Sequence, residues 1–274
     1  MTEPLHVTHV EPLPEWIRGI YDSAFDGSEQ KLQWASDLTD DQLASTLPGS
    51  NVIITGKRRL TESLIRAAGA ELRMIQVVGR APWAVDLDCA RKLDIPVSLL
   101  PHRGAIAVAE HTIALMLGLM RKLVPGHAGT KSAEYQKHNI EPIRTSERVI
   151  AFNWLKFTDV QQLYGKTIGL VGLGDIGLEV ARRARAFDMD VLYTKRDPLP
   201  PDYEMMAEVE YAPLSDLLQR SDVVSLHAPH TLQTEGLLDA AAFTQMKQTA
   251  VLVNTSRGGL VDEDAMVNAL RTGS

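Results

Sequence analysis

The chain of 274 residues is long enough for two domains of ordinary size, and its 45% hydrophobic and 23% charged residues are typical of a globular protein with a sizeable core. A formal net charge of −7 argues against a nucleic-acid partner, because no excess of basic side chains is available to neutralise phosphates. The single cysteine, Cys89, excludes an internal disulfide, and residues 1–6 lack the basic start and apolar stretch of a signal peptide. Both observations favour a cytoplasmic protein.

Strand-like and helix-like segments alternate in the first third of the chain. Runs rich in Val, Ile and Leu predict strands at residues 51–55, 72–78 and 95–100. Helices are expected between them at residues 60–68 and 86–93, and the second should bury Cys89. Such alternation indicates βαβ units and a parallel sheet. In the first 50 residues, Trp16 and Trp34 are expected to be core anchors or interface residues, and the core is favoured.

A long helix is predicted at residues 108–122. Apolar residues surround its axis, so we expect it to be buried against a second domain or a second subunit. Its most apolar run, residues 113–120, is judged too short to cross a bilayer, and no membrane partner is expected. Residues 124–163 show weak periodicity and are expected to form an arm or an extended connection.

A second alternating region begins at Thr167. Strands are predicted at residues 167–171, 189–193, 208–211, 223–226 and 250–253. Helices are predicted near residues 178–187, 214–219, 240–246 and 262–270. This order of elements is typical of a doubly wound parallel sheet.

A glycine-rich turn joins the first strand of this region to its first helix. Gly172, Gly174 and Gly177 have the G-x-G-x-x-G spacing, and Asp175 and Ile176 lie within it. The first glycine allows a tight turn, the second lets a pyrophosphate approach the backbone, and the third lets the helix pack on the strand. This glycine pattern is much stronger evidence for dinucleotide binding when it lies between a strand and a helix than when it occurs alone. The chain is therefore expected to bind a dinucleotide, or to descend from one that did.

The end of the next strand bears on the choice of cofactor. NAD sites usually carry an acidic residue about 20 residues beyond the fingerprint, where it accepts hydrogen bonds from the ribose. Here Thr194 is followed by Lys195 and Arg196, which could clamp the 2′-phosphate of NADP. NADP(H) is therefore favoured over NAD(H). The alternative is a solvated turn whose Asp197 still reaches the ribose.

His227, Ala228 and Pro229 leave a strand at its carboxyl end, the edge at which open α/β sheets bind ligands. His227 is therefore a candidate for contact with the cofactor, although a histidine at a strand end more often serves as a structural hydrogen-bonding group. His230 is expected to face solvent rather than to take part in catalysis.

Another buried strand ends at Asn254, and Thr255, Ser256 and Arg257 follow it. Gly258 and Gly259 then turn the chain, and Asp262 is predicted to cap the next helix. A guanidinium at this edge can hold a substrate carboxylate with two hydrogen bonds and polarise the adjacent carbonyl. A salt bridge across the domain junction is the alternative role for Arg257.

Taken together, the fingerprint, residues 227–229 and residues 254–264 resemble the D-isomer-specific 2-hydroxyacid dehydrogenases, and residues 109–112 also match that family. The resemblance runs from about residue 51 to the last residue. It implies an α/β fold with a flavodoxin-like substrate domain at residues 1–101 and a Rossmann cofactor domain at residues 102–274, both incomplete at the C-terminus. It also implies a cleft between the domains and a homodimer formed through the long helix and the arm.

The resemblance further implies hydride transfer between NAD(P)H and a small 2-keto or 2-hydroxy acid, with Arg257 as the substrate-binding catalytic residue. The ending at residues 194–196 is similar to that of NADPH-preferring glyoxylate and hydroxypyruvate reductases. The implied cofactor-binding residues are Gly172, Gly174, Asp175, Ile176, Gly177, Thr194, Lys195, Arg196, His227, Ala228, Pro229, Thr234, Thr255, Ser256 and Arg257. The implied substrate-binding residues are Ala81, Pro82, Trp83 and Arg257, and no metal is implied.

The chain departs from the family pattern at two places. The family commonly has a Gly-x-Gly loop that holds the substrate carboxylate; here residues 79–85 place Pro82, which has no N–H, and the bulky Trp83 in that loop. Capture of the carboxylate must be rearranged, or the substrate differs.

The second departure concerns acid–base chemistry. The family's catalytic histidine and its glutamate partner lie beyond the stretch matched by residues 269–273, and the sequence stops at Ser274. His227 and His230 are not expected to replace that acid. Both lie on the cofactor side, and a general acid must be within reach of the reacting group before its pKa is relevant. The favoured interpretation is a fragment of a longer reductase. The alternatives are an inactive fragment and a non-catalytic NAD(P)-binding sensor or partner-binding protein.

Overall fold

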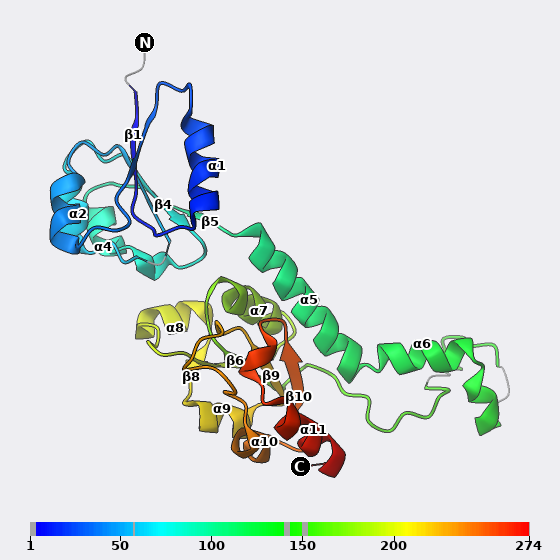
Figure 1. Cartoon of the computed structure of the whole chain (residues 1–274). Coiled ribbons are helices and arrows are strands. Elements are labelled where there is room, and N and C mark those ends of the chain that lie inside the picture. The colour runs from blue at the N-terminus through cyan, green and yellow to red at the C-terminus, as the bar shows by residue number, and fades with distance from the viewer. Residues whose placement is uncertain (1–3, 57, 140–142, 150–152, 274) are drawn as a thin grey trace. The chain divides into compact units, whose positions relative to one another are not determined.

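A computed structural model describes residues 4–56, 58–139, 143–149 and 153–273. Within it the chain divides into two compact units, Met1–Ala105 and Ile106–Ser274 (Figure 1). The start of the N-terminal segment, residues 1–3, and parts of the predicted arm, residues 140–142 and 150–152, lie outside the described residues. The assignment of the two units to substrate and cofactor binding stays a prediction.

The first unit is built on a five-stranded parallel sheet in the order β2-β1-β3-β4-β5. This is the flavodoxin-like order, so the predicted fold is confirmed. Its strands are β1 (His6–His9), β2 (Lys31–Trp34), β3 (Val52–Thr55), β4 (Met74–Val78) and β5 (Val97–Leu100). Its helices are α1 (Glu15–Phe25), α2 (Asp40–Thr46), α3 (Glu62–Ala68), the 3-10 turn η1 (Pro82–Ala84) and α4 (Leu87–Lys92).

Alternate residues of the strands and the inner faces of the helices form the core of this unit, in which Ile53 and Ile75 are fully buried. Cys89 is buried in α4, as predicted. Trp34 packs on His9 and Tyr21, with ring centroids 4.7 and 5.9 Å away. The assignment of Trp16 to the core is wrong, because α1 turns that side chain outward and leaves it 70% exposed.

The second unit also contains a five-stranded parallel sheet, in the order β10-β9-β6-β7-β8. Numbered from its own first strand this is the order 3-2-1-4-5 of a doubly wound Rossmann fold, read in reverse, which confirms the prediction. Its strands are β6 (Thr167–Val171), β7 (Asp190–Thr194), β8 (Glu210–Tyr211), β9 (Val223–Leu226) and β10 (Val251–Asn254). Its sheet helices are α7 (Asp175–Arg185), α8 (Pro201–Ala207), α9 (Leu214–Arg220), α10 (Ala240–Gln245), the turn η3 (Gly258–Leu260) and α11 (Glu263–Thr272).

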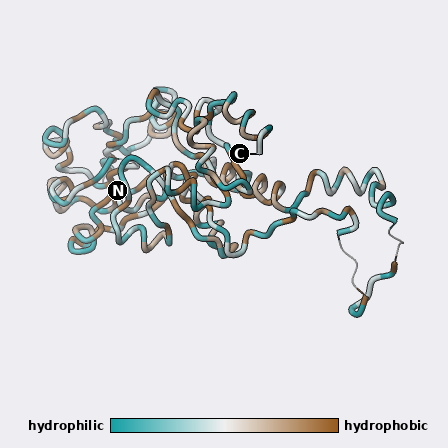
Figure 2. Tube along the Cα trace, turned by 90° about the horizontal axis from the view of Figure 1, so that it is seen from below, coloured by the Kyte–Doolittle hydropathy of each residue, from teal (hydrophilic) through white to brown (hydrophobic). Residues whose placement is uncertain are grey.

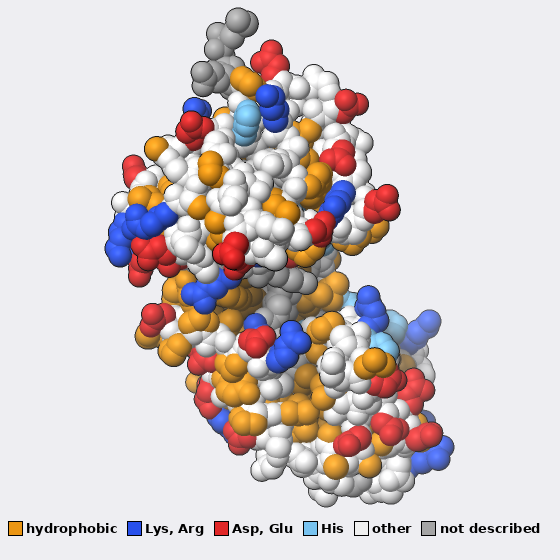
Figure 3. Space-filling model, turned by 60° about the vertical axis from the view of Figure 1, so that its left-hand side comes forward, with side chains coloured by type: hydrophobic (Ala, Val, Ile, Leu, Met, Phe, Trp, Pro, Cys, Tyr) orange, Lys and Arg blue, Asp and Glu red, His pale blue; other side chains and the backbone are white. Residues whose placement is uncertain are grey.

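The central strands of this sheet, β6 and β9, are buried on both faces, which explains their continuous apolar sequence. Because all strands are parallel, the carboxyl ends of β6, β7, β9 and β10 lie along one edge. That edge carries the candidate site. Elsewhere on the surface, hydrophobic side chains lie among acidic and basic ones, as one face shows in Figure 3. Figure 2 shows that hydrophilic and hydrophobic residues alternate along most of the chain.

The long helix α5 (Arg103–Met120) differs from its prediction in two respects. Only one face of the helix is buried, and it includes Ala109, Thr112 and Met116. On the other face, Leu115 and Leu119 are 39% and 52% exposed. By length and composition alone this 18-residue helix is apolar enough to cross a membrane, a property that core helices share.

The predicted arm contains regular structure. The helix α6 (Leu123–Lys131) and the turn η2 (Glu134–His138) follow α5 directly (Figure 1). Trp154 packs against Tyr135 at the end of this segment, with ring centroids 5.6 Å apart. Pro125, Gly126 and Gly129 lie inside α6, so its sequence gives little sign of a helix.

Candidate cofactor and substrate site

The glycine-rich turn is fixed by the neighbouring strands. Gly172 has φ of +100°, and a Cβ on it would lie 2.6 Å from the Ala228 nitrogen and 2.7 Å from the His227 carbonyl carbon. Its own N–H donates to the Thr194 carbonyl at 2.9 Å. No side chain fits here, so the turn after β6 lies tightly between the ends of β7 and β9.

Gly174 has a different environment. It caps α7 with extended backbone angles, φ −98° and ψ −159°, and a Cβ on it would meet nothing within 4 Å. A Cβ on Gly177, by contrast, would lie 2.5 Å from the Gly172 carbonyl oxygen. Gly177 is therefore required for packing of helix on strand, whereas Gly174 borders open space at the start of α7, which Asp175 and Ile176 begin. An anion can approach the backbone there.

The residues that follow β7 are basic and only partly buried. Burial lowers the pKa of the Lys195 ammonium, and the nearby Asp197 carboxylate opposes that shift. The Arg196 side chain is 92% exposed and its Nε lies 3.4 Å from the Asp197 carboxylate. Lys195 is held against the protein while Arg196 extends into solvent, and both lie beyond Thr194, which contacts the glycine turn.

His227 is a neutral histidine at the carboxyl end of β9. Burial lowers its pKa to about 4. Its Nε2 is hydrogen-bonded to the Ser225 hydroxyl at 2.9 Å, an interaction expected of a structural histidine. Its Nδ1 is also buried and has no hydrogen-bonding partner within the described parts of the chain. The His227 backbone lies against Gly172.

The loop after β9 is closed by its own hydrogen bonds. The Thr234 hydroxyl donates to the Pro229 carbonyl at 2.7 Å and accepts from the Thr231 N–H at 2.8 Å. The Ser256 hydroxyl donates to the Ala228 carbonyl at 2.7 Å and so joins this loop to the end of β10. In this structure Thr234 and Ser256 therefore hold the backbone of the candidate site.

The turn that carries Arg257 is braced by Asn254. The Asn254 side chain accepts from the Ser256 N–H at 3.0 Å and donates to the Arg257 carbonyl at 2.9 Å. Thr255 contacts the Thr112 hydroxyl of α5 at 3.0 Å. Sequence reasoning missed both supporting residues. An Asx turn at Asn254 was readable from its position after a strand, whereas no local signal pairs Thr112 with Thr255, since 143 residues separate them.

The Arg257 side chain is exposed at the carboxyl edge of the sheet. Its Nη1 donates to the Ser256 carbonyl at 2.9 Å. Within the described part of the second unit, Arg257 forms no ion pair. Most of its N–H groups are available to a carboxylate.

Comparison with known proteins identifies the family. The model described as D-isomer specific 2-hydroxyacid dehydrogenase, NAD binding domain, matches residues 113–274. The chain belongs to the D-isomer specific 2-hydroxyacid dehydrogenase family.

Individual members of this dehydrogenase family give the same result. A Staphylococcus aureus protein named as a 2-hydroxyacid dehydrogenase is 35% identical over 205 residues, which are 74% of this chain and 59% of that protein. The hydroxypyruvate reductase of Thermotoga maritima is 30% identical over 90% of this chain and 74% of its own length. A glyoxylate reductase structure from Paecilomyes thermophila is 26% identical, with a TM-score of 0.53 over 99% of this chain and 79% of that one. The chain thus spans 59% of the first of these relatives.

The remaining sequence-predicted residues lie in the first unit. Ala81 precedes the 3-10 turn η1, Pro82 begins it, and Trp83 is partly buried within it. Gly79, with φ of +123°, turns the chain out of β4 toward them. Ala81, Pro82 and Trp83 therefore form one compact loop, whereas Arg257 and the cofactor residues lie in the second unit. Within the described ranges, no group of three or more His, Cys, Asp or Glu side chains is placed to hold a metal ion.

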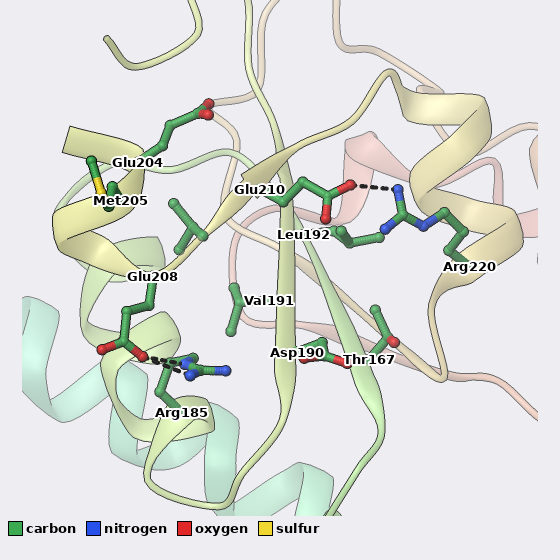
Figure 4. A pocket seen from close by; sticks show the side chains of 11 residues that line it. Thr167, Arg185, Asp190, Val191, Leu192, Glu204, Met205, Glu208, Glu210 and Arg220 are labelled. Atoms are coloured by element: carbon green, nitrogen blue, oxygen red, sulfur yellow. Dashed lines mark hydrogen bonds and ion pairs between the residues drawn. The ribbon is translucent and has the colours of Figure 1, made fainter. Parts of the chain in front are cut away.

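A cavity of about 430 Å³ in the second unit lies away from these residues. It is bounded by β7, α8 and β8, with Thr167 and Asp190 at the amino ends of β6 and β7 (Figure 4). Two ion pairs, Arg185 with Glu208 at 2.6 Å and Arg220 with Glu210 at 2.7 Å, flank it. None of the candidate cofactor or substrate residues lines this cavity. Ligands of open α/β sheets bind at the opposite, carboxyl edge.

Proposed function

We propose that this protein reduces a small 2-keto acid of the glyoxylate or hydroxypyruvate type to the 2-hydroxy acid, with NADPH as the preferred reductant. Two relatives carry the names of hydroxypyruvate and glyoxylate reductases, which supports this substrate class. The observation that carries the proposal is the exposed Arg257 guanidinium on a braced turn at the ligand-binding edge of a dinucleotide fold.

The described residues fit a nicotinamide dinucleotide. The open space at Gly174 admits a pyrophosphate to the start of α7. Lys195 and Arg196 would hold a 2′-phosphate, the group that separates NADPH from NADH. When bound, the reduced nicotinamide supplies the hydride. The protein's part is to bind, orient and polarise.

Arg257 would bind the substrate carboxylate with two hydrogen bonds and place a positive charge beside the carbonyl that is reduced. Asn254 fixes the backbone on which it stands. We assign Ala81, Pro82 and Trp83 as the substrate loop of the first unit. Because Pro82 has no N–H, this loop would favour a short acid through the bulk of Trp83 rather than through an extra hydrogen bond.

Replacement of Arg257 tests the proposal. R257Q should lower kcat/KM for glyoxylate by about 100-fold, because a neutral amide cannot form the bidentate charged contact. R257K should retain part of the activity. The matched control is R271Q, an exposed arginine of α11, with wild-type kinetics. The R271Q control should also bind NADPH as the wild type does; wild-type kinetics in R257Q would refute the role of Arg257.

We also propose that the protein is a homodimer formed through α5 and the segment that follows it. The exposed face of α5 and the start of α6 carry Leu115, Leu119, Leu123 and Val124, the last two 57% and 76% exposed. A second copy would remove this apolar surface from water. Sedimentation equilibrium should give twice the chain mass, and a monomer at micromolar concentration would contradict the dimer.

A further inference from the structure

The loop after β9 and the turn after β10 are bonded to each other along their length. The Gly236 N–H donates to the Gly259 carbonyl at 2.8 Å, and the Leu238 N–H donates to the Leu260 carbonyl at 3.0 Å. The Asp262 N–H returns a bond to the Leu238 carbonyl at 3.0 Å. Residues 236–238 and 259–262 therefore form a small parallel ladder that links two loops of the candidate site.

His230 packs on this ladder at Gly259. A Cβ on Gly259 would lie 2.5 Å from the His230 Nε2 and 2.8 Å from its Cε1, so the imidazole occupies the space that a side chain would need. A Cβ on the neighbouring Gly258 would meet nothing within 4 Å. The contact is therefore specific to one side of the turn that follows Arg257.

Glu235 fixes the orientation of that imidazole. Its carboxylate pairs with the His230 Nε2, and the two side chains are 39% and 62% exposed. Both residues belong to the loop closed by the Thr234 hydroxyl bond to the Pro229 carbonyl. The His230 imidazole is thus held by Glu235 of its own loop while it contacts Gly259 in the turn after β10.

Two consecutive glycines make the turn after Arg257 intrinsically flexible, because glycine loses more conformational freedom on ordering than any other residue. Asn254 restrains the turn before them, through the Ser256 N–H and the Arg257 carbonyl. Restraint after Arg257 comes from the ladder and from the His230 ring. The position of the guanidinium therefore depends on contacts made on both sides of it.

We propose that His230, held by Glu235, is a positioning residue that presents Arg257 to the substrate carboxylate. This inference rests on the proposed role of Arg257 and extends it to a residue that we expected only to face solvent. His230 acts through the Gly258–Leu260 turn and needs no contact with substrate or cofactor. Its loss should weaken carboxylate binding and leave NADPH binding intact.

The first test measures binding of oxamate, a 2-keto acid analogue, to the NADPH-saturated protein by titration calorimetry. H230A should weaken oxamate binding about tenfold, and H230F, which keeps a ring on Gly259, should recover most of the loss. H6A, an exposed histidine of the other unit, is the matched control and should bind oxamate as the wild type does. The NADPH Kd of each variant reports whether the second unit is folded; where H230A fails to bind NADPH, E235Q replaces it, with a smaller loss expected.

A double-mutant cycle separates positioning from general damage to the site. R257K should bind oxamate weakly, and adding H230A to R257K should change the Kd by less than about twofold, because both changes remove the same contact. A full additional tenfold loss in the double variant would overturn the proposal. If R257K alone binds oxamate as tightly as the wild type does, the proposed role of Arg257 fails instead.

A readout that needs no substrate completes the test. Hydrogen–deuterium exchange of a peptide spanning residues 254–262 should be faster in H230A than in the wild type, while exchange of α7 stays the same. Unchanged exchange in residues 254–262 would show that His230 does not restrain the turn, whatever Arg257 does.

Discussion

Lys195 and Arg196 differ in how firmly they are held. Lys195 is half-buried, and burial lowers the pKa of its ammonium, whereas the Arg196 side chain is 92% exposed beside Asp197. A phosphate between them would contact one half-buried cation and one exposed cation. Lys195 should therefore contribute more to recognition of the 2′-phosphate than Arg196.

Exchange of this pair should change the choice of cofactor. The variant K195D/R196A should lower the ratio of NADPH to NADH affinity by about 10- to 100-fold, since charged hydrogen bonds are lost and an acid that repels the 2′-phosphate is gained. Fluorescence titration of both cofactors measures the ratio. Unchanged relative affinities would mean that the basic pair is a solvated turn and that Asp197 is the group that matters.

His227 makes folding depend on pH. Its pKa falls from an ordinary 6.5 to about 4 in the folded chain, so between these values the unfolded state binds more protons. The free energy of unfolding should therefore decrease as the pH falls from 6.5 to 4, by about 3 kcal/mol from this residue. Denaturant titrations at several pH values should give a shallower decrease in H227Q than in the wild type. Parallel curves would show that His227 is not a buried neutral group.

At the scale of elements, the turn between β6 and α7 contains one glycine that is needed for packing, Gly172, and another that borders the proposed ligand site, Gly174. G174A should fold normally, within about 0.5 kcal/mol of the wild type, because its Cβ enters open space at an ordinary φ. It should nevertheless weaken NADPH binding at least about tenfold, since the methyl group occupies the approach of the pyrophosphate.

G172A is the matched variant at the same turn. Gly172 has φ of +100°, and a Cβ on it would lie too close to the backbone of His227 and Ala228. The substitution should therefore lower the free energy of unfolding by about 2–4 kcal/mol. Thermal unfolding should thus show a large loss of stability in G172A and almost none in G174A, whereas NADPH titration should show weakened binding in the stable variant G174A. An NADPH affinity in G174A equal to that of the wild type would place the pyrophosphate elsewhere.

The second unit could be predicted closely because its central strands, β6 and β9, are buried on both faces. The expected strands at residues 167–171 and 223–226 have the observed bounds. The first 50 residues gave no such pattern, because β1 and β2 are four-residue strands that carry His6, His9, Lys31 and Gln33. Pro14 begins α1 without a side-chain cap, so its start is also weakly marked.

The candidate site was predictable only where it follows local backbone rules. The three glycines could be assigned because turn, approach and packing each require that residue type. The contact of His230 with Gly259 could not, because it joins residues of two loops through tertiary structure. The same holds for the bond between Thr112 and Thr255.

For the whole molecule, the fold and the family are established, and the chemistry is the proposal. The dinucleotide turn, Arg257 and its bracing residues belong to one compact unit, and the loop at Pro82 belongs to the other.

The most direct measurement is NADPH consumption by the protein purified from its own source, with glyoxylate, hydroxypyruvate and pyruvate offered in turn. We predict a loss of NADPH absorbance with glyoxylate or hydroxypyruvate, matched mole for mole by the 2-hydroxy acid, and slower consumption of NADH. Absence of turnover with every 2-keto acid, in a protein that binds NADPH tightly, would contradict the reductase and leave a nucleotide-binding protein without this activity.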